Sequence, residues 1–159
     1  MKKIEFNSVF DIIGPSMVGP SSSHTAGVVR IGNKARELFQ KKCTNNLKNV
    51  QIYLYGSFAK TYKGHATDVA AVGGILGFET DNLLIKNAFD IAKQQGINVN
   101  IIPTDDEIPI DVTLPKGENN PHPNTIKILL ENDNNSLIVV GVSIGGGSMK
   151  IIGVRSENV

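Results

Sequence analysis

Apolar residues recur with helical spacing in three segments of the chain. The first segment, residues 24–42, follows a run of serines and predicts an amphipathic helix with a serine as its N-cap. A second helix, rich in small residues, is predicted at 69–76, and a third at about 82–95 with Gly96 as its stop. Positions predicted to face the core are Val28, Ile31, Ala35 and Leu38 in the first helix, and Leu84, Ile85, Ala88, Phe89, Ile91 and Ala92 in the third.

Alternation of apolar and polar residues predicts five strands, at 50–55, 97–101, 125–131, 136–144 and 148–154. Residues 132–135, Asn-Asp-Asn-Asn, are typical of a hairpin turn. A region of about twenty residues, 104–123, is expected to be a functional or disordered loop, with only a short strand candidate near 110–112. Helices come early and strands cluster late, which favours an α+β fold with a mixed or antiparallel sheet covered by helices.

Composition narrows the class of protein. The 159 residues, 40% hydrophobic and 19% charged, indicate a single globular domain over residues 1–159. Because 16 Lys+Arg nearly balance 15 Asp+Glu, we expect neither nucleic acid nor an anionic membrane as a partner. No apolar run reaches the roughly 20 residues of a membrane span, and Glu5 interrupts any signal peptide, so a cytoplasmic location is predicted. One thiol, Cys43, excludes an internal disulfide and cannot by itself hold an iron–sulfur cluster.

Hydroxyl side chains gather at the predicted start of the first helix. Residues 19–27 read Gly-Pro-Ser-Ser-Ser-His-Thr-Ala-Gly, and hydroxyls with free N–H groups at a helix N-terminus suit a carboxylate or phosphate. The plain structural alternative is that one serine caps the helix and the others face water. The segment is not a P-loop, because the Gly-x-x-x-x-Gly-Lys-Ser/Thr pattern is missing.

The other two histidines also lie where the periodic pattern breaks. His65 sits in a glycine-preceded turn before the second helix, as a candidate general base or simply as a surface histidine. His122 lies between two prolines and precedes Asn124, whose amide can donate and accept. The triple glycine 145–147 is either a flexible turn or a close approach of backbone to a ligand. Zinc is disfavoured, because no two histidines stand at metal-ligand spacing.

Six segments carry a combined resemblance: 10–15 (FDIIGP), 19–27 (GPSSSHTAG), 55–59 (YGSFA), 63–68 (KGHATD), 122–125 (HPNT) and 143–147 (SIGGG). Together and in this order they resemble the β chain of the bacterial iron–sulfur-dependent L-serine dehydratase, or L-serine ammonia-lyase. The resemblance implies conversion of L-serine to pyruvate and ammonia without pyridoxal phosphate. It implies a [4Fe-4S] cluster ligated by a partner α chain and no cofactor or metal on this chain alone. It further implies a fold like the allosteric-substrate-binding domain of some phosphoglycerate dehydrogenases.

Carried over by position, the resemblance implies His65 and His122 as catalytic residues, with His65 as the leading base. His122 and Asn124 would orient the amino or carboxylate group of the substrate. The remaining substrate-binding residues would be Ser22, Ser23, His24 and Thr25, which cradle the carboxylate, and Ser143, Gly145 and Gly146, which form the pocket floor. A Lewis-acidic iron on the α chain would bind the departing hydroxyl while the base removes the Cα proton.

Two alternatives to a catalytic role stay open. The domain could bind L-serine only as a regulatory sensor, with its pocket facing a second copy of itself, or it could be a scaffold that stabilises the α chain. A homodimer is therefore a further partner to consider. Family β chains of the two-chain type usually continue into an ACT domain, whereas this sequence ends at Val159. We therefore expect no ACT domain in this chain and carry over no regulation assigned to it.

Overall fold

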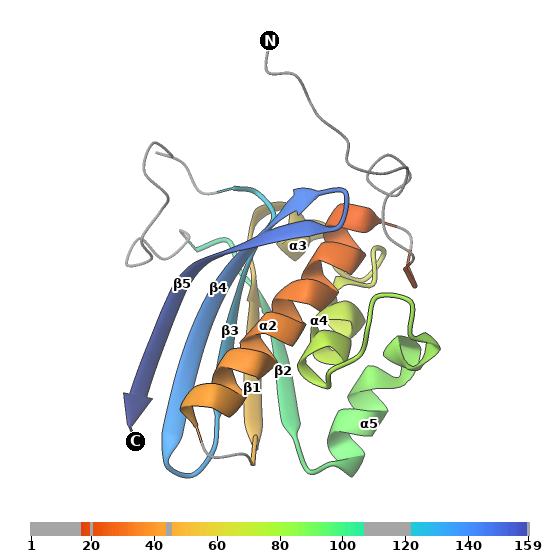
Figure 1. The fold of residues 1–159 in the computed structure, drawn as a ribbon. Coiled ribbons are helices and arrows are strands. Elements are labelled where there is room, and N and C mark those ends of the chain that lie inside the picture. The colour runs from red at the N-terminus through yellow and green to blue at the C-terminus, as the bar shows by residue number, and fades with distance from the viewer. Residues whose placement is uncertain (1–16, 20, 44–45, 107–121, 159) are drawn as a thin grey trace, which may run out of the picture.

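The computed structural model describes residues 17–19, 21–43, 46–106 and 122–158. Within them, five strands form one open sheet in the order β2-β1-β3-β4-β5 (Figure 1). The strands are β1 (Asn49–Leu54), β2 (Asn98–Pro103), β3 (Thr125–Glu131), β4 (Asn135–Gly145) and β5 (Ser148–Asn158). β1 and β2 run parallel, and every other neighbouring pair is antiparallel. The predicted α+β class with a mixed sheet is thereby confirmed, as are all five strands.

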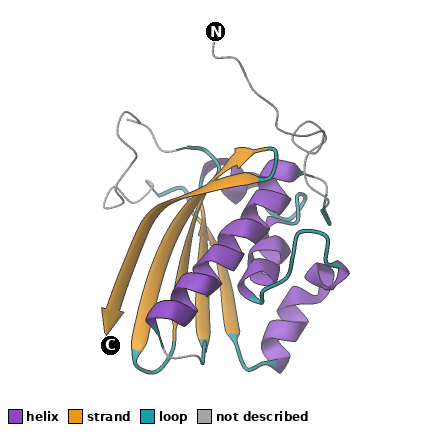
Figure 2. Ribbon diagram, in the orientation of Figure 1, coloured by secondary structure: helices purple, strands orange, loops and turns teal. Residues whose placement is uncertain are grey.

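The helical elements are a π-helical turn η1 (Ser22–Ala26), α2 (Gly27–Lys42), α3 (Gly56–Thr61), α4 (Thr67–Ile75), a 3₁₀ turn η2 (Leu83–Asn87) and α5 (Ala88–Gln94). Helices α2, α4 and α5 lie on one face of the sheet, as the purple and orange elements of Figure 2 show. Among the described helices, none combines the length and the apolar character that a membrane crossing needs. The helix α3 was not predicted.

The third predicted helix is α-helical only in its second half. Its first turn is the 3₁₀ turn η2, in which the Asn82 side chain accepts a hydrogen bond from the Leu84 N–H at 2.9 Å. A 3₁₀ turn has about three residues per turn, so its side chains leave the line that an α-helix would follow. Leu84, predicted to face the core, is consequently 52% exposed, while Ile85, Ala88 and Ala92 are buried as predicted.

Two glycines allow α2 and α4 to pack backbone against backbone. A Cβ on Gly74 would lie 2.2 Å from the Val29 carbonyl oxygen, and one on Gly32 would lie 2.7 Å from that of Ala71. Any larger side chain would separate the helices, so this contact fixes how α4 lies against α2. Side chains that fill the layer between helices and sheet include Val28, Ile31, Phe39, Ile52, Leu54, Phe58, Ile128, Leu130 and Val139.

The predicted turns are largely confirmed. Asn132 donates its N–H to the Asn135 carbonyl at 3.0 Å in the β3–β4 hairpin, and Gly96, at φ +75°, follows α5. Gly145, Gly146 and Gly147 all have positive φ in the turn between β4 and β5. The strand candidate near 110–112 and the segment 10–15 lie outside the described residues.

Candidate active site

Two turns that precede helices bring His24 and His65 into contact. His24 lies in η1, immediately before α2, and His65 lies in the turn before α4. Their rings meet in a T-shaped arrangement, with centroids 4.7 Å apart and planes at 78°. The Thr25 hydroxyl joins the same two turns, because it donates to the His65 carbonyl oxygen at 2.8 Å. Two of the three predicted site segments therefore form one cluster.

The serine run caps a different element from the one predicted. The Thr25 N–H donates to the Ser21 carbonyl at 3.0 Å, and the His24 N–H donates to the Ser21 hydroxyl oxygen at 3.2 Å, so Ser21 closes the π-helical turn. The N-cap position of α2 is Ala26, which has no capping side chain. The expectation of a serine cap on this helix was wrong, because the turn inserts before the helix begins. The Ser22 side chain lies outside what the structure describes.

Both ring nitrogens of His24 are engaged by hydroxyl groups. Nδ1 lies 2.9 Å from Ser23 Oγ, and Nε2 lies 2.9 Å from Ser57 Oγ. The Phe58 ring packs on the same imidazole, with centroids 5.1 Å apart. Burial lowers the pKa of His24 below its ordinary value, and His65 beside it lowers this pKa further. In its neutral form one His24 nitrogen donates and the other accepts, so His24 keeps no nitrogen free for a substrate proton.

The contact of Ser57 with His24 was not predicted, although the Tyr55-Gly56-Ser57 segment was noted. Ser57 is the second residue of α3, and its N–H donates to the Pro123 carbonyl at 3.0 Å. Gly56 has a φ of +52°, and a Cβ there would lie 2.6 Å from the same oxygen. In the sequence, the only local sign of a functional role for Ser57 was a glycine and a serine directly after a predicted strand. The contact between Ser57 and His24 depends on the tertiary fold.

One buried ring nitrogen of His65 has no hydrogen-bond partner among the described residues. This atom, Nδ1, is one of three such buried side-chain atoms, with Thr67 Oγ1 and Ser143 Oγ. Residue His65 also lines a hollow of about 340 Å³, together with residues 60–64. Lys60 and Lys63, both exposed, border this hollow. His65 thus faces space where positive charge would favour a carboxylate.

The His122 loop joins the cluster through its backbone. The Asn124 N–H donates to His122 Nδ1 at 3.0 Å, and Pro123 accepts the Ser57 N–H described above. Because His122 Nδ1 accepts a hydrogen bond, the proton of the neutral ring belongs on Nε2, which is then a donor. This state suits a residue that orients a substrate oxygen better than one that removes a proton.

Ser143 lies between the His122 loop and the start of α2. It is fully buried, and its N–H donates to the Asn124 carbonyl at 3.0 Å. Its unpartnered hydroxyl packs on Gly27, the first residue of α2, where a Cβ would lie 2.1 Å from Oγ. Gly145 and Gly146 stand at the β4–β5 turn with nothing within 4 Å of a Cβ position, and their role in a pocket floor stays a prediction.

The ligand sets of the described residues do not suit an iron–sulfur cluster. No group of three or more His, Cys, Asp or Glu side chains occurs within the part of the chain that the structure describes. Cys43 is buried at the C-terminal end of α2, and burial raises the pKa of its thiol, against a smaller opposing effect of Lys42. A thiol that stays protonated is a poor metal ligand.

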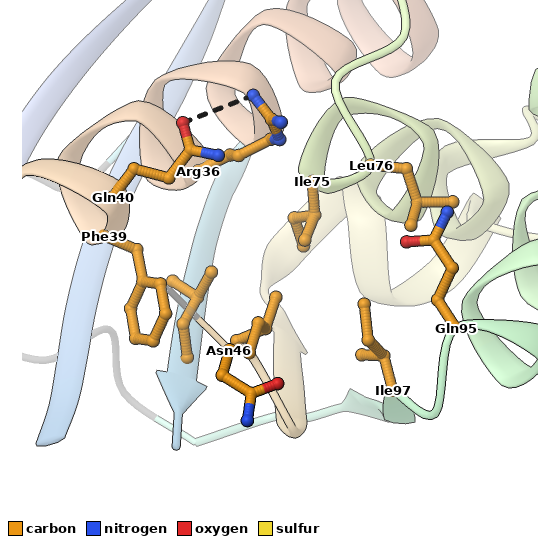
Figure 3. A pocket seen from close by; sticks show the side chains of 10 residues that line it. Arg36, Phe39, Gln40, Asn46, Ile75, Leu76, Gln95 and Ile97 are labelled. Carbon is orange, nitrogen blue, oxygen red and sulfur yellow. Dashed lines mark hydrogen bonds between the residues drawn. The ribbon is translucent and has the colours of Figure 1, made fainter. Parts of the chain in front are cut away.

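A larger hollow, of about 510 Å³, lies at the other end of α2 and α4 (Figure 3). Polar side chains of Arg36, Gln40, Asn46 and Gln95 stand over an apolar floor that includes Ile75. None of the predicted site residues lines it. The histidine cluster is therefore the candidate active site, although the larger hollow lies elsewhere.

Comparison with known proteins agrees with the sequence resemblance. The family model of the serine dehydratase beta chain matches residues 8–151. A probable L-serine dehydratase beta chain of Bacillus subtilis (strain 168) is 45% identical over 148 residues, which are 93% of this chain and 60% of that protein. The L-serine dehydratase beta chain of Peptoniphilus asaccharolyticus is 47% identical over 149 residues, with the same two shares.

More distant similarity extends to other serine dehydratases. L-serine dehydratase 1 of Escherichia coli (strain K12) is 38% identical over 73 residues, which are 45% of this chain and 16% of that protein. The chain spans about 60% of the length of the two beta chains that it matches along most of its own length. On the match over residues 8–151 and these identities, the chain belongs to the serine dehydratase beta chain family.

Proposed function

We propose that this chain is the β-chain part of an L-serine dehydratase, which eliminates water from L-serine and yields pyruvate and ammonia. Family membership supports the reaction, and the names of the two beta chains support a partner α chain. The observation that carries a catalytic role is at His65, which lines a hollow before α4 and whose buried Nδ1 has no partner among the described residues. Buried polar atoms without a partner are uncommon and call for an explanation, and a substrate group supplies one.

We assign the [4Fe-4S] cluster of this enzyme class to the α chain. This chain has a single cysteine, and its thiol is buried, so its own residues do not fit a cluster. When bound, such a cluster supplies a Lewis acid for the hydroxyl that leaves the substrate. The cytoplasm, where thiols stay reduced, is the compartment that we propose for the assembly.

Within this chain, His65 is the best candidate for the base that removes the Cα proton. His24 has both ring nitrogens engaged by hydroxyls, and His122 accepts a hydrogen bond at Nδ1. His65 alone combines a buried ring nitrogen without a partner and a place beside a hollow. A general base of this kind contributes about 10²- to 10⁴-fold to the rate.

The remaining predicted residues orient the amino acid. The hydroxyls of Ser23 and Thr25 already bond to His24 and to the His65 carbonyl, so they hold the histidine pair in place. The buried Ser143 hydroxyl, packed on Gly27 at the start of α2, has no such engagement among the described residues, and we assign it to the carboxylate of the substrate. The Ser143 N–H donates to the Asn124 carbonyl, which brings the His122 loop next to Ser143. His122 and Asn124 complete the set of residues that bind the amino and carboxylate groups of the substrate.

Anaerobic co-expression with an α chain tests the proposal. We expect serine-dependent pyruvate from the pair and none from either chain alone. Pyruvate production by the α chain alone would refute a catalytic role for this chain. If His65→Ala left the kcat of the pair unchanged but altered activation by serine, the regulatory-sensor alternative would replace the proposal.

A further inference from the structure

The Ser57 hydroxyl occupies one side of the His24 ring and holds it from a separate element. Ser57 belongs to α3, whereas His24, 33 positions earlier in the chain, belongs with Ser23 to η1. The hydroxyls of Ser21, Ser23 and Ser57 and the His24 ring form one hydrogen-bonded row, with steps of 3.2, 2.9 and 2.9 Å. A hydroxyl can donate or accept, so Ser23 and Ser57 hold both edges of the ring in either tautomer and thereby fix its plane.

The place of Ser57 is itself set by the backbone. Gly56 adopts a left-handed φ of +52°, which other residues rarely adopt, and packs on the Pro123 carbonyl. That carbonyl accepts the Ser57 N–H at 3.0 Å, and the Ser57 carbonyl accepts the Thr61 hydroxyl at 2.7 Å. Three contacts thus fix a single residue whose side chain reaches His24.

Orientation of His24 bears directly on His65. The two rings meet at 78° with centroids 4.7 Å apart, so a turn of the His24 plane would displace its neighbour. From this geometry we infer that Ser57 is a positioning residue: its hydroxyl fixes the plane of the His24 ring, which in turn holds His65 in place. The kinetic part of the inference rests on the proposed function, while the structural part does not.

Magnetic-resonance relaxation of the His24 ring in the 159-residue chain tests the structural part. In the wild type we expect the ring to hold a single orientation, with a high order parameter for its Cδ2–H bond. In Ser57→Ala this order parameter should fall as the ring gains freedom, and Ser57→Thr, which keeps the hydroxyl, should restore it. Asn82→Ala is the control, because it removes a side-chain hydrogen bond to the Leu84 N–H in η2 and none of those around His24.

Two results would overturn the inference. One is a His24 ring that is freely mobile in the wild type, a measurement that needs no variant to fold. The other is a Ser57→Ala order parameter identical to that of the wild type. In the assembled enzyme, Ser57→Ala should lower kcat on the order of tenfold while Asn82→Ala stays within about twofold. An assembly inactive on L-serine would refute the proposed function, yet the relaxation measurements would still decide the role of Ser57.

Discussion

Replacing Ser143 by alanine tests whether the hydroxyl of this residue binds a ligand or stabilises the fold. The Ser143 hydroxyl is fully buried and has no hydrogen-bond partner among the residues that the structure describes. Leaving such a group unsatisfied costs about 1 to 3 kcal/mol, and the void left by one oxygen atom costs well under 1 kcal/mol. We therefore expect Ser143→Ala to raise the free energy of unfolding by between roughly zero and 2 kcal/mol.

The reference variant is Thr25→Val. Thr25 is equally buried, but its hydroxyl donates to the His65 carbonyl at 2.8 Å. Its loss should lower the free energy of unfolding by about 1 to 3 kcal/mol, because a buried carbonyl loses its donor. Urea unfolding followed by circular dichroism measures both variants.

Activity of the assembled enzyme completes the comparison. Ser143→Ala should lower kcat/KM for L-serine on the order of tenfold or more, the loss of one hydrogen bond to a charged group. A Ser143→Ala chain that is destabilised by more than about 1 kcal/mol would refute the reasoning, because the hydroxyl would then have a partner within the protein.

Three further outcomes follow from the same contacts. Burial lowers the pKa of His24 in the folded chain, so the unfolded chain binds the proton more tightly. The free energy of unfolding should therefore be highest above pH 6.5, the ordinary pKa of the ring, and should fall as the pH drops below it. In urea unfolding at a series of pH values, His24→Gln should weaken this dependence. Thr67→Val, which removes another buried unpartnered hydroxyl, should leave the free energy of unfolding unchanged or raise it; a loss above about 1 kcal/mol would contradict this. Gly74→Ala should lower the free energy of unfolding by about 1 to 3 kcal/mol, because its Cβ would lie 2.2 Å from a carbonyl oxygen. Gly64→Ala, whose Cβ would lie 3.8 Å from the nearest atom, should change this free energy by less than about 1 kcal/mol.

Local patterns were sufficient for most of the fold. The alternation at 50–55 and 97–101 predicted β1 and β2 because one side of each strand faces the helices. The Asn-rich 132–135 segment predicted the hairpin because its turn is made by neighbouring residues. The 3₁₀ turn η2 was missed, since the apolar spacing of these five residues fits an α-helix equally well.

The candidate site could be found in pieces but not assembled. His24 and His65 stood out because they interrupt periodic segments near helix starts. Their pairing depends on the close crossing of α2 and α4 at Gly32 and Gly74, 42 positions apart in the chain, which no local pattern encodes. The reach of Ser57 to His24 likewise depends on the left-handed Gly56 and its contact with the His122 loop.

The rate of pyruvate formation by the assembly with His65→Gln tests the central claim most directly. Glutamine keeps a polar side chain of comparable reach but cannot act as a base near neutral pH. Binding of L-serine, measured on the same sample, separates loss of chemistry from loss of substrate. The account predicts a fall in kcat on the order of 10² or more with binding retained. A His65→Gln enzyme that forms pyruvate within a few fold of the wild-type rate would contradict it.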